Sequence, residues 1–161
     1  MQVTLTPAEM LTAAVQGAAR YITNLRDRRR DKHGSVGDST WATHIEGVCG
    51  EIALAKVLGV YWSNHLARFD TDDVGALQVR TRPEAWHELI VHKHDRDDRV
   101  FVLLLGRAPT FRVAGWIRGA DAKQATWWKD PAGGRPAFFV PQESLVPGLP
   151  PREAWQARGA A

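Results

Sequence analysis

Apolar residues recur at helical spacing along the N-terminal part of the chain. Thr6 offers a cap, Pro7 suits the first helical position, and Glu9 places an acid in the first turn. The apolar positions that follow are Met10, Leu11, Ala14, Val15, Ala18, Tyr21, Ile22 and Leu25. This pattern predicts a long amphipathic helix.

A second helix is predicted to begin at Ser39 or Thr40 and to end at Leu58, where Gly59 provides a stop signal. Much of its buried face consists of Ile45, Val48, Ile52, Ala55 and Val57. Small residues on this helix allow another element to approach closely, namely Gly47, Gly50 and Ala53.

Beyond Leu66 the helical pattern gives way to short runs rich in β-forming residues. The predicted strands are Leu77–Thr81, Leu89–His92, Val100–Leu105, Phe111–Ile117 and Ala137–Val140. A short helix is predicted at Gly119–Lys129. This order predicts an α/β or α+β fold, in which helices flank a sheet of mainly antiparallel strands.

The length of 161 residues fits one domain, which we assign to residues 1–150. Residues 151–161 are polar and rich in small residues, and we expect them to form a flexible tail. The only cysteine, Cys49, excludes a disulfide within one chain and favours a reducing, cytoplasmic location. No segment approaches the roughly 20 apolar residues that span a bilayer, and the N-terminus has no signal-peptide pattern, so we expect no membrane partner.

A formal net charge of +3 permits a polyanionic partner without requiring one. The basic side chains that could contact nucleic acid are Arg28, Arg29, Arg30, Arg112, Arg118 and Lys123. The same residues also suit a solvated surface. Trp116, Trp127 and Trp128 could stack on bases, although tryptophans of a small domain more often fill its core.

One segment combines an acid, a glycine turn and two polar residues on a predicted strand. Asp73 precedes Gly75, and Gln78 and Arg80 are two positions apart, so they share one strand face. Leu77 and Val79 lie on the opposite face, an alternation that any half-buried strand also shows. We interpret the segment as one β-hairpin that carries the acid and both polar groups.

In this order of residues the chain resembles the PD-(D/E)xK nuclease superfamily, with Glu51, then Asp73, then Gln78-Val79-Arg80. Residues 47–56 are similar to the glycine-bearing helix that delivers an acid in many members. The resemblance covers about residues 41–145 and is to small phage and actinobacterial members. It implies a restriction-endonuclease-like mixed sheet flanked by helices, with the first helix as an addition.

The resemblance also implies a function, hydrolysis of DNA phosphodiester bonds by a Mg²⁺- or Mn²⁺-dependent endo- or exodeoxyribonuclease. The implied catalytic residues are Glu51, Asp73, Gln78 and Arg80, and the implied metal ligands are Asp73, Glu51, the Gln78 side-chain oxygen and the Val79 carbonyl. Gln78 stands where the family has an acid and Arg80 where it has lysine, and a guanidinium cannot accept a proton from water. The alternative is a catalytically degenerate nuclease fold that binds nucleic acid or a protein partner, including a second copy.

Histidines outside this motif allow two interpretations. His92 and His94 lie on one face of a strand end, a spacing that suits a transition metal or, equally, two exposed strand-end residues. His44 is nearly two helical turns before Glu51, so it lies either beside the site or on the helix surface.

Overall fold

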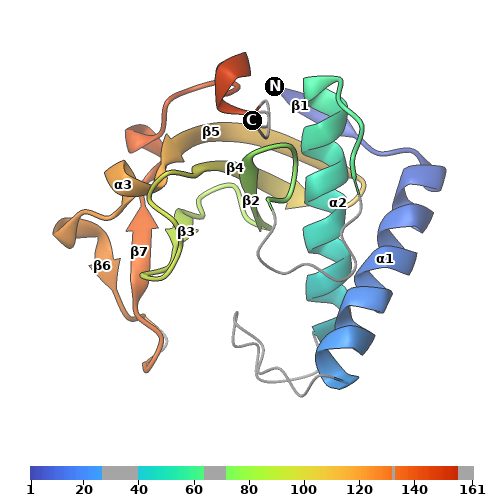
Figure 1. Cartoon of the computed structure of the whole chain (residues 1–161), viewed down its shortest axis with the longest axis horizontal. Helices are drawn as coiled ribbons and strands as arrows, with labels where there is room; N and C mark the ends of the chain where they lie inside the picture. Colours follow the sequence, from blue (N-terminus) through green and yellow to red (C-terminus); the bar gives the residue numbers. More distant parts are fainter. Residues whose placement is uncertain (27–39, 64–71, 132, 156–161) are drawn as a thin grey trace, which may run out of the picture.

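Two long helices and two β-sheets form most of the computed structural model (Figure 1), which describes residues 1–26, 40–63, 72–131 and 133–155. The helices are α1 (Pro7–Arg26), α2 (Thr40–Leu58) and the short α3 (Gly119–Ala122). The strands are β1 (Gln2–Thr4), β2 (Leu77–Arg82), β3 (Leu89–Val91), β4 (Val100–Arg107), β5 (Thr110–Arg118), β6 (Trp128–Lys129) and β7 (Ala137–Val140). Single 3-10 turns, η1 to η3, occupy Ala125–Trp127, Gln142–Ser144 and Arg152–Ala154.

The larger sheet is mixed. Its strand order is β1-β5-β4-β2, with β2 parallel to β4 and the other pairs antiparallel. The second sheet is antiparallel, in the order β3-β7-β6. The fold is therefore of the mixed α/β class, as the sequence predicted. Because β2 is an edge strand of the larger sheet, one of its sides is open to groups from elsewhere in the chain.

Helix α2 packs between α1 and the larger sheet (Figure 1). Gly17 allows the two helices to approach closely, because a Cβ at this position would lie 2.6 Å from the Ile45 backbone Cα. Four large apolar side chains of α1 are exposed, Leu11, Val15, Ile22 and Leu25. None of the helices in the described part of the chain combines the length and the apolar character that crossing a membrane requires.

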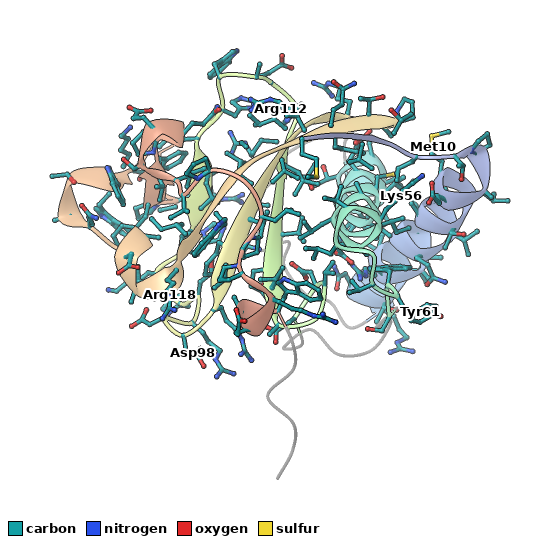
Figure 2. All side chains as sticks on the ribbon, turned by 90° about the horizontal axis from the view of Figure 1, so that it is seen from above. Met10, Lys56, Tyr61, Asp98, Arg112 and Arg118 are labelled. Carbon is teal, nitrogen blue, oxygen red and sulfur yellow. The ribbon has the colours of Figure 1, made fainter. Side chains whose placement is uncertain are left out.

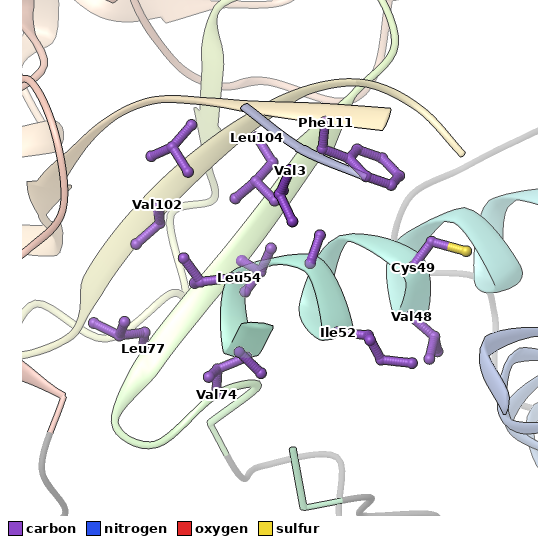
Figure 3. Close-up of a cluster of buried hydrophobic side chains, with 14 of the residues drawn as sticks. Val3, Val48, Cys49, Ile52, Leu54, Val74, Leu77, Val102, Leu104 and Phe111 are labelled. Carbon is purple, nitrogen blue, oxygen red and sulfur yellow. The ribbon is translucent and has the colours of Figure 1, made fainter. Parts of the chain in front are cut away.

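Apolar side chains fill both faces of the larger sheet. On the α2 side, Val48, Ile52 and Leu54 pack against strand residues that include Val102 and Leu104 (Figure 3). On the other side, Phe101, Leu103 and Leu105 pack against the second sheet at Leu89, Val91 and Val140. Strand β4 thus alternates between two cores, which explains its uninterrupted apolar run.

The helix boundaries and strand positions agree closely with the sequence pattern. Helix α2 begins at Thr40 and ends immediately before Gly59, as predicted. The prediction of one short helix over Gly119–Lys129 is wrong, because α3 ends at Ala122 and is followed by η1 and strand β6. Strand β1 is an addition that the pattern did not predict.

The C-terminal segment was expected to be a flexible tail over residues 151–161. Its first part has a defined place, because residues 152–154 form η3 and Trp155 packs against the core on the α2 side. The Trp155 carbonyl accepts a hydrogen bond of 3.2 Å from the Ala76 N–H, so this segment covers the turn before β2. Residues 156–161 lie outside the described residues.

Candidate functional site at the edge of the sheet

A tight turn places Asp73 at the open edge of β2. The Asp73 N–H donates to the Leu77 carbonyl at 2.9 Å, and Gly75 has a φ of +59°, a conformation that glycine adopts without strain. The Asp73 Oδ2 atom accepts the Val79 N–H at 2.7 Å. The prediction of a β-hairpin here is wrong, because β2 pairs in parallel with β4. Only a single antiparallel bridge joins Val74 and Leu77.

The second acid, Glu51, comes from α2 and is only 5% exposed. Its two carboxylate oxygens accept Arg20 Nη1 at 2.5 Å and Arg20 Nη2 at 2.8 Å, and Trp62 Nε1 donates to Oε2 at 3.1 Å. A buried carboxylate requires such partners, because an unpaired charge in a protein interior is costly. Helix α1 therefore contributes a cation to the site.

The two carboxylates are close enough for their charges to interact. The pKa of Asp73 is raised to about 7, first by burial and then by the negative charge of Glu51. The positive charges of Arg80 and Arg20 and the hydrogen bond from the Val79 N–H act in the opposite direction. An acid pair from α2 and the turn before β2, flanked by two arginines, is the candidate site.

Arg80 faces away from α2, toward the second sheet. Its alternation with the buried Val79 agrees with the predicted strand faces. Its guanidinium donates to the Ile90 carbonyl at 3.3 Å, to the Val79 carbonyl at 3.3 Å and to Asp95 Oδ2 at 2.9 Å. It also lies over the Phe101 ring, 5.0 Å from the centroid. These contacts fix the guanidinium on this face of β2, and its positive charge still acts on Asp73.

Gln78 shares the strand face of Arg80, as predicted, but belongs to a neighbouring network. Its Nε2 donates to Asp72 Oδ1 at 3.1 Å, and the same oxygen is 2.8 Å from Arg99 Nε. The amide is therefore oriented with its nitrogen toward Asp72, which leaves the side-chain oxygen as an acceptor.

The donor set fits a hard divalent cation such as Mg²⁺ or Mn²⁺. Asp73 and Glu51 would supply carboxylate oxygens, and Gln78 and Val79 neutral ones, although both Glu51 oxygens already accept Arg20 and the Val79 carbonyl already accepts Arg80. Among the described residues, no three histidine, cysteine or acidic side chains form a group that could hold a metal. Mg²⁺ usually keeps several waters and takes only one or two carboxylates, so an acid pair is the kind of donor set that it would use.

Three of the residues predicted to contact nucleic acid, Arg112, Arg118 and Lys123, are among the described residues. Arg112 and Arg118 are exposed at opposite ends of β5 (Figure 2). Lys123 is held internally, since its Nζ donates to the Lys93 and Asp95 carbonyls and lies 2.6 Å from Asp97 Oδ1. Lys123 thus stabilises the loop before β4. The remaining three, Arg28, Arg29 and Arg30, lie outside the described residues.

The other aromatic and histidine residues are dispersed. Trp116 and Trp127 are half-buried, while Trp128 is exposed and contacts the Phe138 ring, with 4.7 Å between the centroids. His44 Nε2 lies 3.5 Å from Asn24 Nδ2, in the contact between α1 and α2. His92 is half-buried and His94 exposed.

Sequence reasoning missed the residues that hold the site together. Arg20 fixes Glu51, Asp95 fixes Arg80, and Arg99 fixes Asp72. The sequence held one signal for Arg20, which is the only charged residue between Glu9 and Arg26. A lone charge on such a helix indicates a specific partner.

Comparisons of the chain with protein-family models, with curated proteins and with solved structures gave no match. The resemblance to PD-(D/E)xK nucleases therefore stays a prediction, which rests on the order of Glu51, Asp73 and Gln78-Val79-Arg80 in the sequence. The charge arrangement at the edge of β2 is an observation independent of that resemblance.

Proposed function

We propose that this protein is a Mg²⁺-dependent nuclease that hydrolyses DNA phosphodiester bonds at the Asp73–Glu51 pair. The observation that carries the proposal is that two carboxylates from separate elements lie close enough for the charge of Glu51 to raise the pKa of Asp73. Bringing two acids together costs electrostatic energy, which a divalent cation between them would relieve. Groups whose pKa is perturbed by burial and by a specific charged neighbour cluster at functional sites.

Asp73 and Glu51 would hold the cation, with Gln78 and Val79 as neutral donors. When bound, Mg²⁺ supplies positive charge to a phosphate oxygen and lowers the pKa of a coordinated water. Arg80 stays protonated and is tied to Asp95, so its part is to balance the charge of Asp73 and to donate hydrogen bonds. Trp62 and Arg20 keep the Glu51 carboxylate oriented.

A second candidate function is nucleic-acid binding without cleavage, and the Arg20–Glu51 pair favours it. Both oxygens of Glu51 are engaged by Arg20, so one of the two acids is already neutralised by a side chain. A cation would have to share Glu51 with Arg20 or displace it. With the basic composition of the chain, such a site would attract phosphate through Arg20 and Arg80.

Cleavage assays on single- and double-stranded DNA separate the two functions. The variants are Asp73→Asn and Glu51→Gln, with the exposed Asp98→Asn as the matched control. We expect cleavage with Mg²⁺ or Mn²⁺, none in EDTA, a loss of about 100-fold or more in both site variants, and an unchanged rate in the control. Salt-sensitive DNA binding without cleavage under any metal would support the second candidate. Absence of both activities would contradict both.

A further inference from the structure

A cleft of about 590 Å³ lies at the other end of β2, away from Asp73. Its walls come from the loop between β2 and β3 and from the segment after β7, with Arg82, Trp86, His87, Lys129, Phe139 and Gln142 among the lining residues. Gln142 Nε2 donates to the Ala85 and His87 carbonyls, both at 2.8 Å, and so ties the two walls together. These hydrogen bonds join the loop between β2 and β3 to the segment after β7.

Arg82 brings an unmatched cation to this cleft. Within the part of the chain that the structure describes, its half-buried guanidinium has no hydrogen-bond or ion-pair partner. The nearby Glu88 is paired with Lys129 Nζ at 3.0 Å, and Glu143 is exposed. Partial burial removes water from the guanidinium, so an anionic group reaching it would gain strong, charge-assisted hydrogen bonds.

Trp86 provides a flat apolar surface beside that cation. Its side chain is 76% exposed, although burial of a ring of this size is favourable. Its ring lies beside the His87 ring, with 4.3 Å between the centroids. His87 Nδ1 accepts the Glu84 N–H at 3.1 Å, so the ring proton is on Nε2, which is a hydrogen-bond donor.

We propose that this cleft binds a nucleotide, with the base stacked on Trp86 and the phosphate paired with Arg82. A planar, uncharged ring joined to an anion matches the exposed indole and the unmatched guanidinium, and the cleft volume suits a ligand of that size. The nucleotide is either free or part of a nucleic-acid strand. This binding needs no metal and no cleavage, so it goes beyond the proposed nuclease function.

The position of the cleft separates it from the acid pair. Arg82 is on the same strand face as Gln78 and Arg80, and Gln78 and Arg82 are roughly 13 Å apart along an extended strand. Glu51 comes from α2, on the other side of the strand, so the cleft is a separate site from the acid pair.

Binding measured by calorimetry in EDTA tests the proposal without any contribution from metal or cleavage. The probes are deoxyadenosine monophosphate, deoxyadenosine, inorganic phosphate and a 5′-phosphorylated hexadeoxyadenylate. The variants are Trp86→Ala, Trp86→Phe and Arg82→Gln. The matched controls, Trp41→Ala and Arg96→Gln, remove exposed residues of the same types elsewhere on the protein.

We expect Trp86→Ala to weaken binding of the monophosphate about fivefold or more, and Trp86→Phe to weaken it less, because a phenyl ring still stacks. Arg82→Gln is expected to weaken the monophosphate but not deoxyadenosine. Preference for the hexanucleotide over the monophosphate identifies a strand as the ligand, and the reverse identifies a free nucleotide. The proposal would be overturned if the variants bound the monophosphate as tightly as the controls do. It would also be overturned if inorganic phosphate bound as tightly as the monophosphate, or if no nucleotide probe bound.

Discussion

At the scale of single residues, the properties of Asp73 depend most on its neighbours. Burial and the charge of Glu51 raise its pKa to about 7, whereas the sequence shows only an aspartate before a glycine turn. The sequence predicted which residue types lie near the edge of β2, since strand alternation fixes the faces of Gln78 and Arg80. It could not predict the shift in pKa, because that shift depends on an acid from another element.

The raised pKa predicts how Asp73 affects stability. The native state keeps the Asp73 proton up to about pH 7, while the unfolded chain loses it near the ordinary value of 3.8, so native stability falls as the pH rises between these values. Asp73→Asn removes the charge and keeps an oxygen to accept the Val79 N–H. We therefore expect its stability relative to wild type to increase from pH 5 to pH 8 in urea unfolding. A difference that does not vary with pH would contradict the raised pKa, and Asp98→Asn serves as the control.

Removal of the Arg20 side chain is expected to destabilise the protein by about 3 kcal/mol, because it leaves the buried Glu51 carboxylate without its cation. The measurement is chemical unfolding of Arg20→Met. The double variant Arg20→Met/Glu51→Gln should recover much of the loss, since it removes the uncompensated charge as well. Equal destabilisation of the single and double variants would show that packing of the Arg20 stem, and not its charge, matters.

At the scale of elements, regular hydrophobic patterns predicted α1, α2 and most of the strands. Short elements were missed where their stability depends on distant partners. Strand β1 has three residues and pairs with β5, and β6 has two and pairs with β7. Two or three residues are too few to show the alternation of apolar and polar positions that identifies a strand in a sequence. The contact between α1 and α2 depends on Gly17, which fixes how close the two helices lie.

Substitution of Gly17 by alanine tests that contact. Alanine favours the helix by about 1 kcal/mol, but its Cβ would meet the Ile45 backbone, so we expect a net loss of roughly 1–3 kcal/mol. Gly47→Ala is the matched control, because a Cβ there meets nothing within 4 Å, and it should stabilise by up to about 1 kcal/mol. Thermal unfolding of both variants measures the difference, and equal shifts in Tm would contradict the close helix contact.

At the scale of the whole molecule, three layers bring the acid pair together. Arg20 of α1 pairs with Glu51 of α2, and the turn before β2 presents Asp73 from the sheet. The C-terminal segment covers that turn, because Trp155 accepts the Ala76 N–H. The register of α1 on α2 and the parallel pairing of β2 with β4 decide whether these groups meet, and neither can be read from local sequence.

Metal binding tests the central claim, that Asp73 and Glu51 form one cation site, most directly. Mn²⁺ binding can be followed by electron paramagnetic resonance, with wild type compared to Asp73→Asn, Glu51→Gln and the control Asp98→Asn. The account predicts that wild type and the control bind one Mn²⁺ with equal affinity, that Mg²⁺ competes for it, and that each site variant weakens binding at least tenfold. Unchanged Mn²⁺ binding in Asp73→Asn and Glu51→Gln, or no binding by wild type, would contradict it.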